Sequence, residues 1–229
     1  LGRARQQEQR GALLLKDGPL RDPDSTAMGH AMLDGVRAEG LGLLTWTKKA
    51  RRLQNRLIFL HHHLGGDWPD VRDDALLDSL EDWLLPHVYG MKRASDLNDL
   101  HVTQLLQGLI SWEQRQQLDD LAPTHLTVPS GSRRPLDYSD PESPVLAVRL
   151  QEMFGLTETP HVANGRVPVT VHLLSPAQRP VQITQDLEHF WESTYYEVRK
   201  DMRGRYPKHY WPEDPHSAIP TNRVRPEGL

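Results

Sequence analysis

The stretch THLTVPSGSRRPLDYSDPESPVLAVRL, residues 124–150, marks a change of pattern along the chain. It contains three short runs of β type, at His125–Val128, Pro135–Tyr138 and Val145–Leu150, which the sequences PSGS and SDPESP separate. Short runs of this kind with turn signals between them are typical of small sheets. The stretch therefore predicts that a β unit begins near residue 123.

The sequence after this stretch extends the β unit and then closes it with a helix. GRVPVTVHLLSP (165–176) and RPVQIT (179–184) predict two more strands, and QEMFG (151–155) is interpreted as a structural plug with Gly155 at a turn. Asp186 or Thr184 can cap a helix that runs to about Arg203. The last residues, HSAIPTNRVRPEGL, predict an irregular or frayed tail. The apolar face of the helix consists of Leu187, Phe190, Trp191, Tyr195 and Val198.

The sequence before it has helical periodicity. Ser25 or Asp24 can cap a first helix, a second is predicted from about Thr47 to His63, and a third covers DDALLDSLEDWLLPH (73–87) until Pro86 ends it. HVTQLLQGLISWEQRQQLDDLAP (101–123) predicts one or two more helices. Residues 23–122 are therefore expected to form a helical bundle. The stripe of the last helices is expected to contain Leu105, Leu106, Leu109, Trp112 and Leu118.

The first 22 residues predict the end of another β unit. GALLL (11–15) is a short apolar run, KDGP (16–19) is a turn signal, and RDPDS (21–25) is interpreted as a linker. The fold class is thus α+β: a helical bundle, then a small antiparallel β unit, or partial barrel, with a long C-terminal helix and an irregular tail. The expected domains are residues 1–22, 23–122 and 123–229.

Composition limits the classes of function. The 229 residues include no cysteine, so disulfides and thiolate zinc sites are excluded, and a reducing cytoplasm is the expected location. The longest apolar run, LIFL (57–60), falls far short of the ~20 residues that span a bilayer, so no membrane is expected. The net charge of −4 gives no general attraction to nucleic acid, which local patches would have to supply. The chain begins with leucine, and we interpret it as a segment of something longer.

Motifs for catalysis or metal binding do not emerge. The run His61–His63 places neighbouring side chains about 100° apart around a helix, so the three cannot share one face, and we interpret it as a polar helix end. PSGSRRP (129–135) lacks the P-loop pattern and the G-x-S-x-G pattern of hydrolases. An anion-binding nest there is an alternative to a tight turn between strands, which we prefer. No catalytic residue and no metal ligand is predicted.

A first basic cluster lies in TKKARRLQNR (47–56). Lys48, Arg52 and Arg56 recur every four residues, which puts them on one helix face that could follow a phosphate backbone. The other interpretation is a solvated face, or pairing with the acidic helix 73–82, and this is preferred because runs of charge usually face water.

A second basic cluster lies in RGRYPKHYWPEDP, residues 203–215. Cations that follow phosphates beside rings that stack on bases are typical of proteins that bind single strands. The prolines stiffen the stretch, however, and large aromatic side chains also anchor structural straps. Both interpretations stay open. The candidate nucleic-acid-binding residues here are Arg203, Arg205, Tyr206, Lys208, Tyr210 and Trp211.

LLSPAQRPVQITQDLEHFWESTYYEVRKDMRGRYPKHYWPEDP (173–215) closely resembles the C-terminal signature of the HrpB family of bacterial DEAH-type ATP-dependent helicases. GLLTWT (42–47), RRLQNRL (51–57), WLLPHVYG (83–90), VPSGSR (128–133), LAVRLQEMFG (146–155) and GRVPV (165–169) agree with it in order. The resemblance implies a multidomain helicase whose RecA-like motor, winged-helix, ratchet and OB-like domains precede this segment. Residues 1–22 would be the last strands of the OB-like domain.

The resemblance also limits what this segment does. The family's Walker A lysine, its D-E-x-H motif and its arginine finger match no position here, so ATP and Mg²⁺ are implied for the parent helicase and no cofactor for this segment. RNA or single-stranded nucleic acid and the helicase core are the implied partners, and no protein partner is identified. We expect an accessory region that contacts nucleic acid and scaffolds the motor. The alternative is a protein-docking or purely structural domain.

Overall fold

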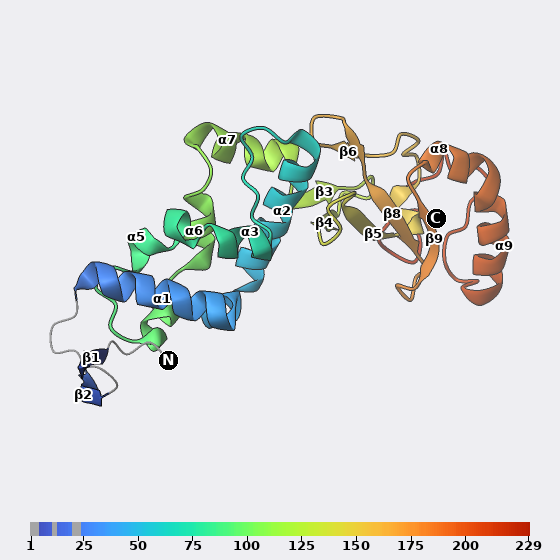
Figure 1. Ribbon diagram of the computed structural model, residues 1–229. Coiled ribbons are helices and arrows are strands. Elements are labelled where there is room, and N and C mark those ends of the chain that lie inside the picture. The colour runs from blue at the N-terminus through green and yellow to red at the C-terminus, as the bar shows by residue number, and fades with distance from the viewer. Residues whose placement is uncertain (1–4, 11–12, 20–23) are drawn as a thin grey trace. The chain divides into compact units, whose positions relative to one another are not determined.

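The computed structural model describes residues 5–10, 13–19 and 24–229. The chain divides into two compact units, which are described separately: unit 1 holds residues 1–58 and 67–115, and unit 2 holds residues 59–66 and 116–229. Figure 1 shows that unit 1 is mainly helical and that unit 2 combines a sheet with helices. The predicted α+β class is confirmed. The predicted domain boundaries stay predictions.

Two paired strands stand at the start of the described chain. Strand β1 (Arg5–Arg10) runs antiparallel to β2 (Leu13–Pro19), with Arg5 opposite Pro19 and a register shift between Glu8 and Gln9. The prediction that KDGP is a turn is wrong, because these residues continue the ladder to its end. The predicted linker falls largely on residues 21–23, which lie outside the described residues. Membership of an OB-like domain stays a prediction.

Helices form the rest of unit 1, and two of them continue into unit 2. Helix α1 was predicted to begin near Thr26 and α2 to run from Thr47 to His63, and both are confirmed within a residue or two. Asp24 occupies the cap position of α1 without a side-chain hydrogen bond. The segments are α1 (Ser25–Glu39), η1 (Leu41–Leu43), α2 (Lys48–Leu64), α3 (Asp73–Asp78), α4 (Leu80–Trp83), α5 (Leu85–Val88), η2 (Ala94–Asp99), α6 (Val102–Gln107) and α7 (Trp112–Leu121).

Helices α1 and α5 approach each other closely at Gly29. A Cβ atom on Gly29 would lie 3.0 Å from Leu85 Cδ1 and 3.5 Å from Tyr89 Cδ1, so a larger side chain would push the two helices apart. The absence of a side chain therefore permits the contact. The α1 face around it is buried through Met28, Met32, Leu33 and Val36.

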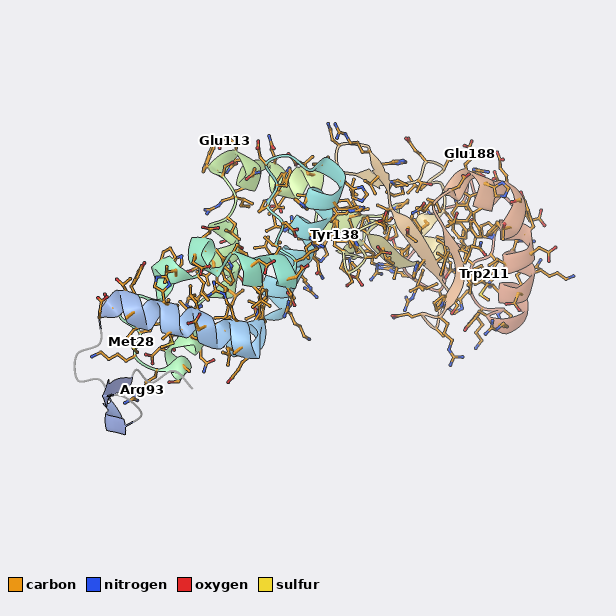
Figure 2. All side chains as sticks on the ribbon, viewed as in Figure 1. Met28, Arg93, Glu113, Tyr138, Glu188 and Trp211 are labelled. Carbon is orange, nitrogen blue, oxygen red and sulfur yellow. The ribbon has the colours of Figure 1, made fainter. Side chains whose placement is uncertain are left out.

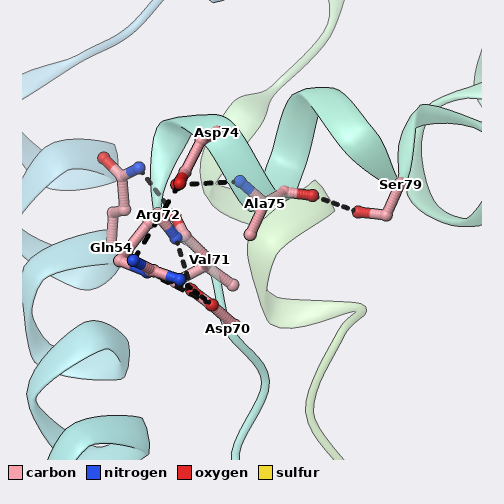
Figure 3. A network of polar contacts seen from close by, with 7 residues as sticks. All are labelled: Gln54, Asp70, Val71, Arg72, Asp74, Ala75 and Ser79. Atoms are coloured by element: carbon pink, nitrogen blue, oxygen red, sulfur yellow. Dashed lines mark hydrogen bonds and ion pairs between the residues drawn. The ribbon is translucent and has the colours of Figure 1, made fainter.

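The single helix predicted over residues 73–87 is wrong: three short helices occupy this range. Ser79 ends α3, and its Oγ donates to the Ala75 carbonyl at 2.7 Å, as Figure 3 shows. A serine that bonds back to the preceding turn competes with the helical ladder. Pro86 does not end a helix as predicted but stands in the first turn of α5, where its missing N–H costs nothing.

The start of α3 is fixed by polar contacts that Figure 3 shows. The Gln54 side chain on α2 donates to the Val71 carbonyl at 2.8 Å, and Asp74 Oδ1 accepts from the Ala75 amide at 2.9 Å. Gln54 is 3% exposed, so its amide has exchanged water for this pairing. Asp73 and Asp74 lie in the first turn of α3, where the positive end of the helix dipole favours negative charge.

The predicted apolar stripe of α6 and α7 is confirmed at three of its five residues, since Leu109 is half-buried and Trp112 is exposed. Leu105, Leu106 and Leu118 are buried, whereas Trp112 is 69% exposed. Trp112 is the first residue of α7, after a break in the helix at residues 108–111. The break resets the helical phase, so spacing counted through it places this residue on the wrong face.

The centre of unit 2 is a five-stranded sheet in the order β3-β4-β5-β8-β9. The predicted runs at 125–128, 135–138, 145–150 and 179–184 are confirmed as strands, but the single strand predicted over residues 165–176 is wrong, because it divides into strands at 167–168 and 170–174 that belong to different sheets. The PSGS turn connects β3 to β4 through the Val128–Ser132 pairing. A separate hairpin pairs β6 with β7. The strands are β3 (His125–Thr127), β4 (Arg133–Asp137), β5 (Val145–Arg149), β6 (His161–Val162), β7 (Val167–Pro168), β8 (Thr170–Leu174) and β9 (Pro180–Thr184).

One pair in this sheet corrects the antiparallel prediction. Strands β5 and β8 are parallel, with Val145 opposite Thr170 and Arg149 opposite Leu174, so the sheet is mixed. A parallel pair needs a crossover connection. Here it consists of η3 (Leu150–Met153), the β6–β7 hairpin and the loops between them. Local alternation reveals strands but not the direction in which they pair.

The predicted long C-terminal helix is confirmed as a run from Leu187 to Arg205, formed by α8 (Leu187–His189), η4 (Phe190–Thr194) and α9 (Tyr195–Arg205). Its middle segment is a π-helix, in which the Tyr195 amide donates to the Phe190 carbonyl five residues back. This wider turn places the rings of Phe190 and Tyr195 with their centroids 6.4 Å apart. Phe190, Trp191 and Tyr195 are all buried.

The QEMFG segment and the C-terminal tail pack together. The predicted structural plug is confirmed, because Met153 and Phe154 are fully buried. Gly155 has a φ of +81°, as its predicted turn requires, and its amide donates to the Pro215 carbonyl at 2.9 Å. The tail is irregular as predicted but not frayed, since the Thr221 amide donates to the Gln151 carbonyl at 3.0 Å.

Candidate nucleic-acid interface

The two predicted basic clusters lie in different units. Lys48, Arg52 and Arg56 belong to the part of α2 in unit 1, and the candidates from Arg203 to Trp211 belong to unit 2. Each cluster is therefore described on its own.

In the α2 cluster, Lys48 and Arg52 are exposed, but Arg56 is 8% exposed and makes contacts of its own. Four residues turn a helix by about 400°, so each step moves the side chain about 40° around the axis. Two such steps bring Arg56 towards the buried side of α2, which carries Leu53 and Leu57. Lys48, Arg52 and Arg56 therefore do not form an exposed row.

Arg51 on the same helix pairs with the acidic helix, as the preferred interpretation of this cluster proposed. Its Nη1 lies 2.9 Å from Asp73 Oδ1 and 2.8 Å from Gln54 Oε1. The guanidinium also lies over the Trp46 ring, 3.8 Å from its centroid. This cluster thus contains Arg51, which is paired with Asp73 within unit 1, and the exposed cations Lys48 and Arg52.

In the C-terminal cluster, Trp211 is the anchor. It is 7% exposed, and its indole Nε1 donates to the Tyr206 carbonyl at 2.9 Å. Its own carbonyl accepts from Arg199 Nε at 2.9 Å. Figure 2 labels it among the side chains beside α9. A ring held in this way is not available to stack on a base, so we remove Trp211 from the candidate binding residues.

Two neighbouring tyrosines are half-buried. The Tyr210 ring meets the edge of Phe154 with centroids 6.0 Å apart, while its amide donates to the Val224 carbonyl at 3.0 Å. The Tyr206 ring contacts His209 edge to face, with centroids 5.8 Å apart. Both residues therefore support the strap, and each keeps part of its ring at the surface.

The α9 helix holds the strap from the other side. The Tyr195 hydroxyl donates to the Pro212 carbonyl at 2.7 Å, and burial raises the pKa of that hydroxyl well above its ordinary value. Arg199 Nη2 lies 3.7 Å from Glu213 Oε1. Residues 206–213 are thus a structural strap tied to α9 by main-chain and side-chain bonds.

The cations at the end of α9 and at the start of this strap are exposed to solvent. Arg203, Arg205 and Lys208 are exposed, and Arg205 forms an exposed pair with Asp201 at 3.2 Å. Within the part of the chain that the structure describes, neither Arg203 nor Lys208 has a carboxylate within ion-pair distance. The last turn of α9, with Arg203 and Arg205, and the strap that follows it, with Lys208, therefore present three exposed cations near the end of the helix, where the negative end of the helix dipole also favours them.

A group of polar residues that the sequence analysis did not select lines a cavity of about 420 Å³ in unit 2. The strap supplies His209 and strand β5 supplies Arg149, while the tail adds Asn222 and Arg223. His209 Nδ1 is buried without a hydrogen-bond partner. No sequence motif joins these residues, since Arg149 lies sixty positions before His209 and the tail residues follow His209 by thirteen and fourteen positions.

Burial and the charge of Arg149 lower the pKa of His209 below its ordinary value. The folded chain therefore favours neutral His209, and this preference destabilises the fold as the pH falls from about 6.5 through the lowered pKa. Arg149→Met removes one of the two causes, so we expect it to raise the pKa of His209. A pH titration of the His209 ring signals by NMR measures this. Arg179→Met is the control for loss of a distant charge, and an equal rise in both variants would contradict the assignment.

The predicted turn at PSGSRRP is confirmed, and its arginine has an internal partner. Arg134 Nη2 lies 2.9 and 2.8 Å from the two carboxylate oxygens of Glu152, which is fully buried. Ser130 Oγ donates to the same carboxylate at 2.9 Å. Arg134 is thus committed to the fold rather than to an anion-binding nest.

The histidine run ends α2 against a loop of unit 2. His63 Nε2 lies 2.8 Å from the Glu142 carbonyl oxygen, and His62 Nε2 lies 3.1 Å from Glu142 Oε1. Over residues 5–10, 13–19 and 24–229, no group of three or more metal-ligating side chains comes together. The same residues include no helix that is both long and apolar enough to cross a membrane.

The sequence matches the family described as ATP-dependent helicase C-terminal (HrpB_C) over residues 83–215, which is more than half of the chain. The chain belongs to the HrpB C-terminal helicase family. The ATP-dependent RNA helicase HrpB of Escherichia coli (strain K12) is 48% identical over 218 residues, which cover 95% of this chain and 27% of that protein. The chain thus spans about a quarter of this HrpB relative.

Solved structures agree with this family. A crystal structure of the E. coli DExH-box NTPase HrpB matches with a TM-score of 0.80 and 48% identity, over 93% of this chain and 26% of that one. A crystal structure of the Escherichia coli DEAH/RHA helicase HrpB matches with a TM-score of 0.69 and 46% identity, over 90% and 26%. The fold described above is therefore the C-terminal fold of HrpB proteins.

Proposed function

We propose that this chain is the accessory C-terminal region of a bacterial ATP-dependent RNA helicase of the HrpB type, that it acts in the cytoplasm, and that it contacts RNA through the phosphate backbone. HrpB relatives whose names state this activity support the helicase part of the proposal. The RNA contact rests on one observation: the last turn of α9 and the anchored strap that follows it carry the exposed cations Arg203, Arg205 and Lys208.

The contact we propose is electrostatic. Arg203, Arg205 and Lys208 are cations that can contact successive phosphates. They lie on the last turn of α9 and on the anchored strap, so their backbone positions are set before RNA binds. Tyr206 and Tyr210 keep part of each ring exposed and can contribute limited stacking. Lys48 and Arg52 on α2 are a second exposed pair that can add to the same electrostatic attraction.

The region also has a proposed scaffolding role, in which its units pack on the helicase core. ATP and Mg²⁺ would be held by the motor domains of the parent protein, because the 229 residues contain no Walker A or D-E-x-H motif. We therefore propose no catalytic residue in this chain. The competing proposal is a protein-docking or purely structural domain, which the burial of Trp211 favours.

Replacing Arg203, Arg205 and Lys208 together by alanine is expected to weaken the binding of single-stranded RNA and to make it less sensitive to salt. Each phosphate contact contributes about 0.7 to the slope of log affinity against log salt for a single strand, so three lost contacts lower the slope by about two. Fluorescence anisotropy of a labelled oligonucleotide at several salt concentrations measures both quantities.

The control replaces Lys92, Arg93 and Arg166 by alanine, which removes the same charge from other exposed positions. We expect the control to keep most of the affinity and the slope. If the unmodified chain does not bind RNA at low salt, or binds without a salt slope, the RNA proposal fails and the docking or structural role replaces it.

A further inference from the structure

The cavity that His209 of the strap lines is unusual in its lining, which is mainly basic and polar. Its volume is about 420 Å³, within the range of about 300–1,000 Å³ that is typical of small-molecule sites. The lining carries three groups of basic chemistry and two side-chain amides, and no carboxylate contributes to it. The lining residues are Arg149, Gln151, Pro176, His209, Asn222, Arg223 and Val224.

Arg149 is half-buried at the end of β5 and has no ion-pair partner among the residues that the structure describes. The nearest buried carboxylate is that of Glu152, which lines a small neighbouring cavity together with Arg149 and Arg134. Arg134 occupies both oxygens of that carboxylate, and Ser130 donates to one of them. The positive charge of Arg149 is therefore not neutralised within the fold.

His209 adds an unsatisfied polar atom to the same cavity. Its Nδ1 is buried without a hydrogen-bond partner, although buried polar atoms in folded proteins are nearly always paired. The charged or titratable groups that face it are Arg149 from β5, Tyr206 from the strap and Arg223 from the tail. None of these three groups is an anion at neutral pH, and the lining of the cavity contributes no carboxylate.

The remaining polar groups are held in place by the fold. The Gln151 amide donates to the Tyr210 carbonyl at 2.9 Å, and Asn222 Nδ2 lies 3.3 Å from Ser132 Oγ. Arg223 pairs with the exposed Glu227, which is not part of the lining. Two guanidinium groups beside a cavity with fixed amides can offer several N–H donors to one oxyanion.

We propose that this cavity binds a phosphoryl group, with Arg149 as its main charged donor and Arg223, His209 and Asn222 around it. Guanidinium groups bind phosphate oxygens through paired, charge-assisted hydrogen bonds, which are stronger than neutral ones. The phosphoryl group can belong to a nucleic-acid chain or to a small phosphate. The site does not use Arg203, Arg205 or Lys208, so it does not depend on the proposed function.

The test titrates the 229-residue chain with inorganic phosphate, followed by calorimetry and by the NMR signals of the His209 ring and the Asn222 amide. We expect phosphate to shift both sets of signals, and Arg149→Met to weaken the affinity by about tenfold or more. Arg179→Met removes an exposed arginine outside the cavity and is expected to leave the affinity unchanged. If Arg149→Met fails to fold, Arg223→Gln replaces it, with an expected weakening of several-fold.

Sulfate, which stays divalent across the pH range, is expected to raise the pKa of His209 when it binds.

Two further arms use a short single-stranded RNA with and without a 5′-phosphate. Binding that needs the 5′-phosphate identifies a terminal phosphate as the ligand, whereas equal binding by both oligonucleotides, lost in Arg149→Met, identifies the phosphodiester backbone. The proposal is overturned if neither phosphate nor RNA moves the His209 signals, or if Arg149→Met binds as tightly as the unmodified chain. The Arg203, Arg205 and Lys208 variant should retain phosphate binding, which keeps the two proposals distinguishable.

Discussion

Arg134→Met is expected to lower the free energy of unfolding of unit 2 by about 3–5 kcal/mol, because it leaves the carboxylate of Glu152 buried without its charged partner. Glu152 is fully buried on η3, and Arg134 on β4 contacts both of its oxygens. After the substitution, the carboxylate would keep the hydroxyl of Ser130 as its donor. Chemical denaturation followed by circular dichroism measures the change.

A matched control is the exposed pair of Arg205 and Asp201, which lies in the same unit at 3.2 Å. Arg205→Met should cost no more than about 0.5 kcal/mol, since solvent screens such helical pairs. The double variant Arg134→Met, Glu152→Met should regain much of the loss, because apolar residues can replace a buried pair at little cost. If Arg134→Met is as stable as Arg205→Met, the buried pair does not hold the β3–β4 turn against η3.

The elements that could be predicted from the sequence are those that local pattern determines. The run of β type at Val145–Leu150 and the alternating pattern within residues 165–176 indicate strands, and β5 and β8 are present there. Their parallel pairing is set by the crossover between them, which no local period encodes. The helix broken at Ser79 has a similar cause, since one hydroxyl bond to Ala75 outweighs a continuous apolar period.

The candidate site was harder to predict from local pattern than the strands and helices, because tertiary packing decides which of its residues are exposed. Four-residue spacing placed Lys48, Arg52 and Arg56 on one face, but the drift of about 40° per step takes Arg56 into the buried part of the helix. The sequence pattern predicted a buried Trp112 and kept Trp211 as a candidate for binding, whereas Trp112 is exposed and Trp211 is buried. Exposure of a tryptophan depends on tertiary packing, and its identity in the sequence does not reveal it.

The cavity of Arg149 and His209 could not be predicted from the sequence. Its residues lie at positions 149, 209, 222 and 223, which belong to a predicted strand, to the basic stretch whose role the sequence left open, and to the irregular tail. Strand β5 gives a partial indication of this site. Its residues alternate between more and less buried positions, and Arg149 follows the buried Val148 at the end of the strand. That pattern indicates a charged residue at a strand end, but the strap and the tail that complete the cavity come from the tertiary fold.

Trp211→Ala is expected to lower the free energy of unfolding of unit 2 by about 3–5 kcal/mol, the range for large-to-alanine changes of buried aromatic residues. The substitution removes a nearly buried indole and the N–H that it donates to the Tyr206 carbonyl, which then keeps the amide of His209 as its donor. Trp112→Ala is the matched control, because the same residue type is 69% exposed there, and a change within about 0.5 kcal/mol is expected. Urea denaturation of both variants, followed by circular dichroism, gives the comparison.

This pair of variants also decides how the basic stretch from Arg203 to Pro215 works. If Trp211 anchors the strap, its loss frees Tyr206 and Lys208, so at a temperature where the variant stays folded we expect RNA affinity to fall as well. A Trp211→Phe variant should recover part of the stability, because it refills the site without restoring the indole N–H. If Trp211→Ala is as mild as Trp112→Ala while RNA binding drops, the indole contacts RNA directly and the strap assignment is wrong. A large loss of stability together with a loss of RNA affinity instead supports RNA binding by cations that the buried indole helps to hold in place, whereas a loss of stability alone supports a purely structural strap.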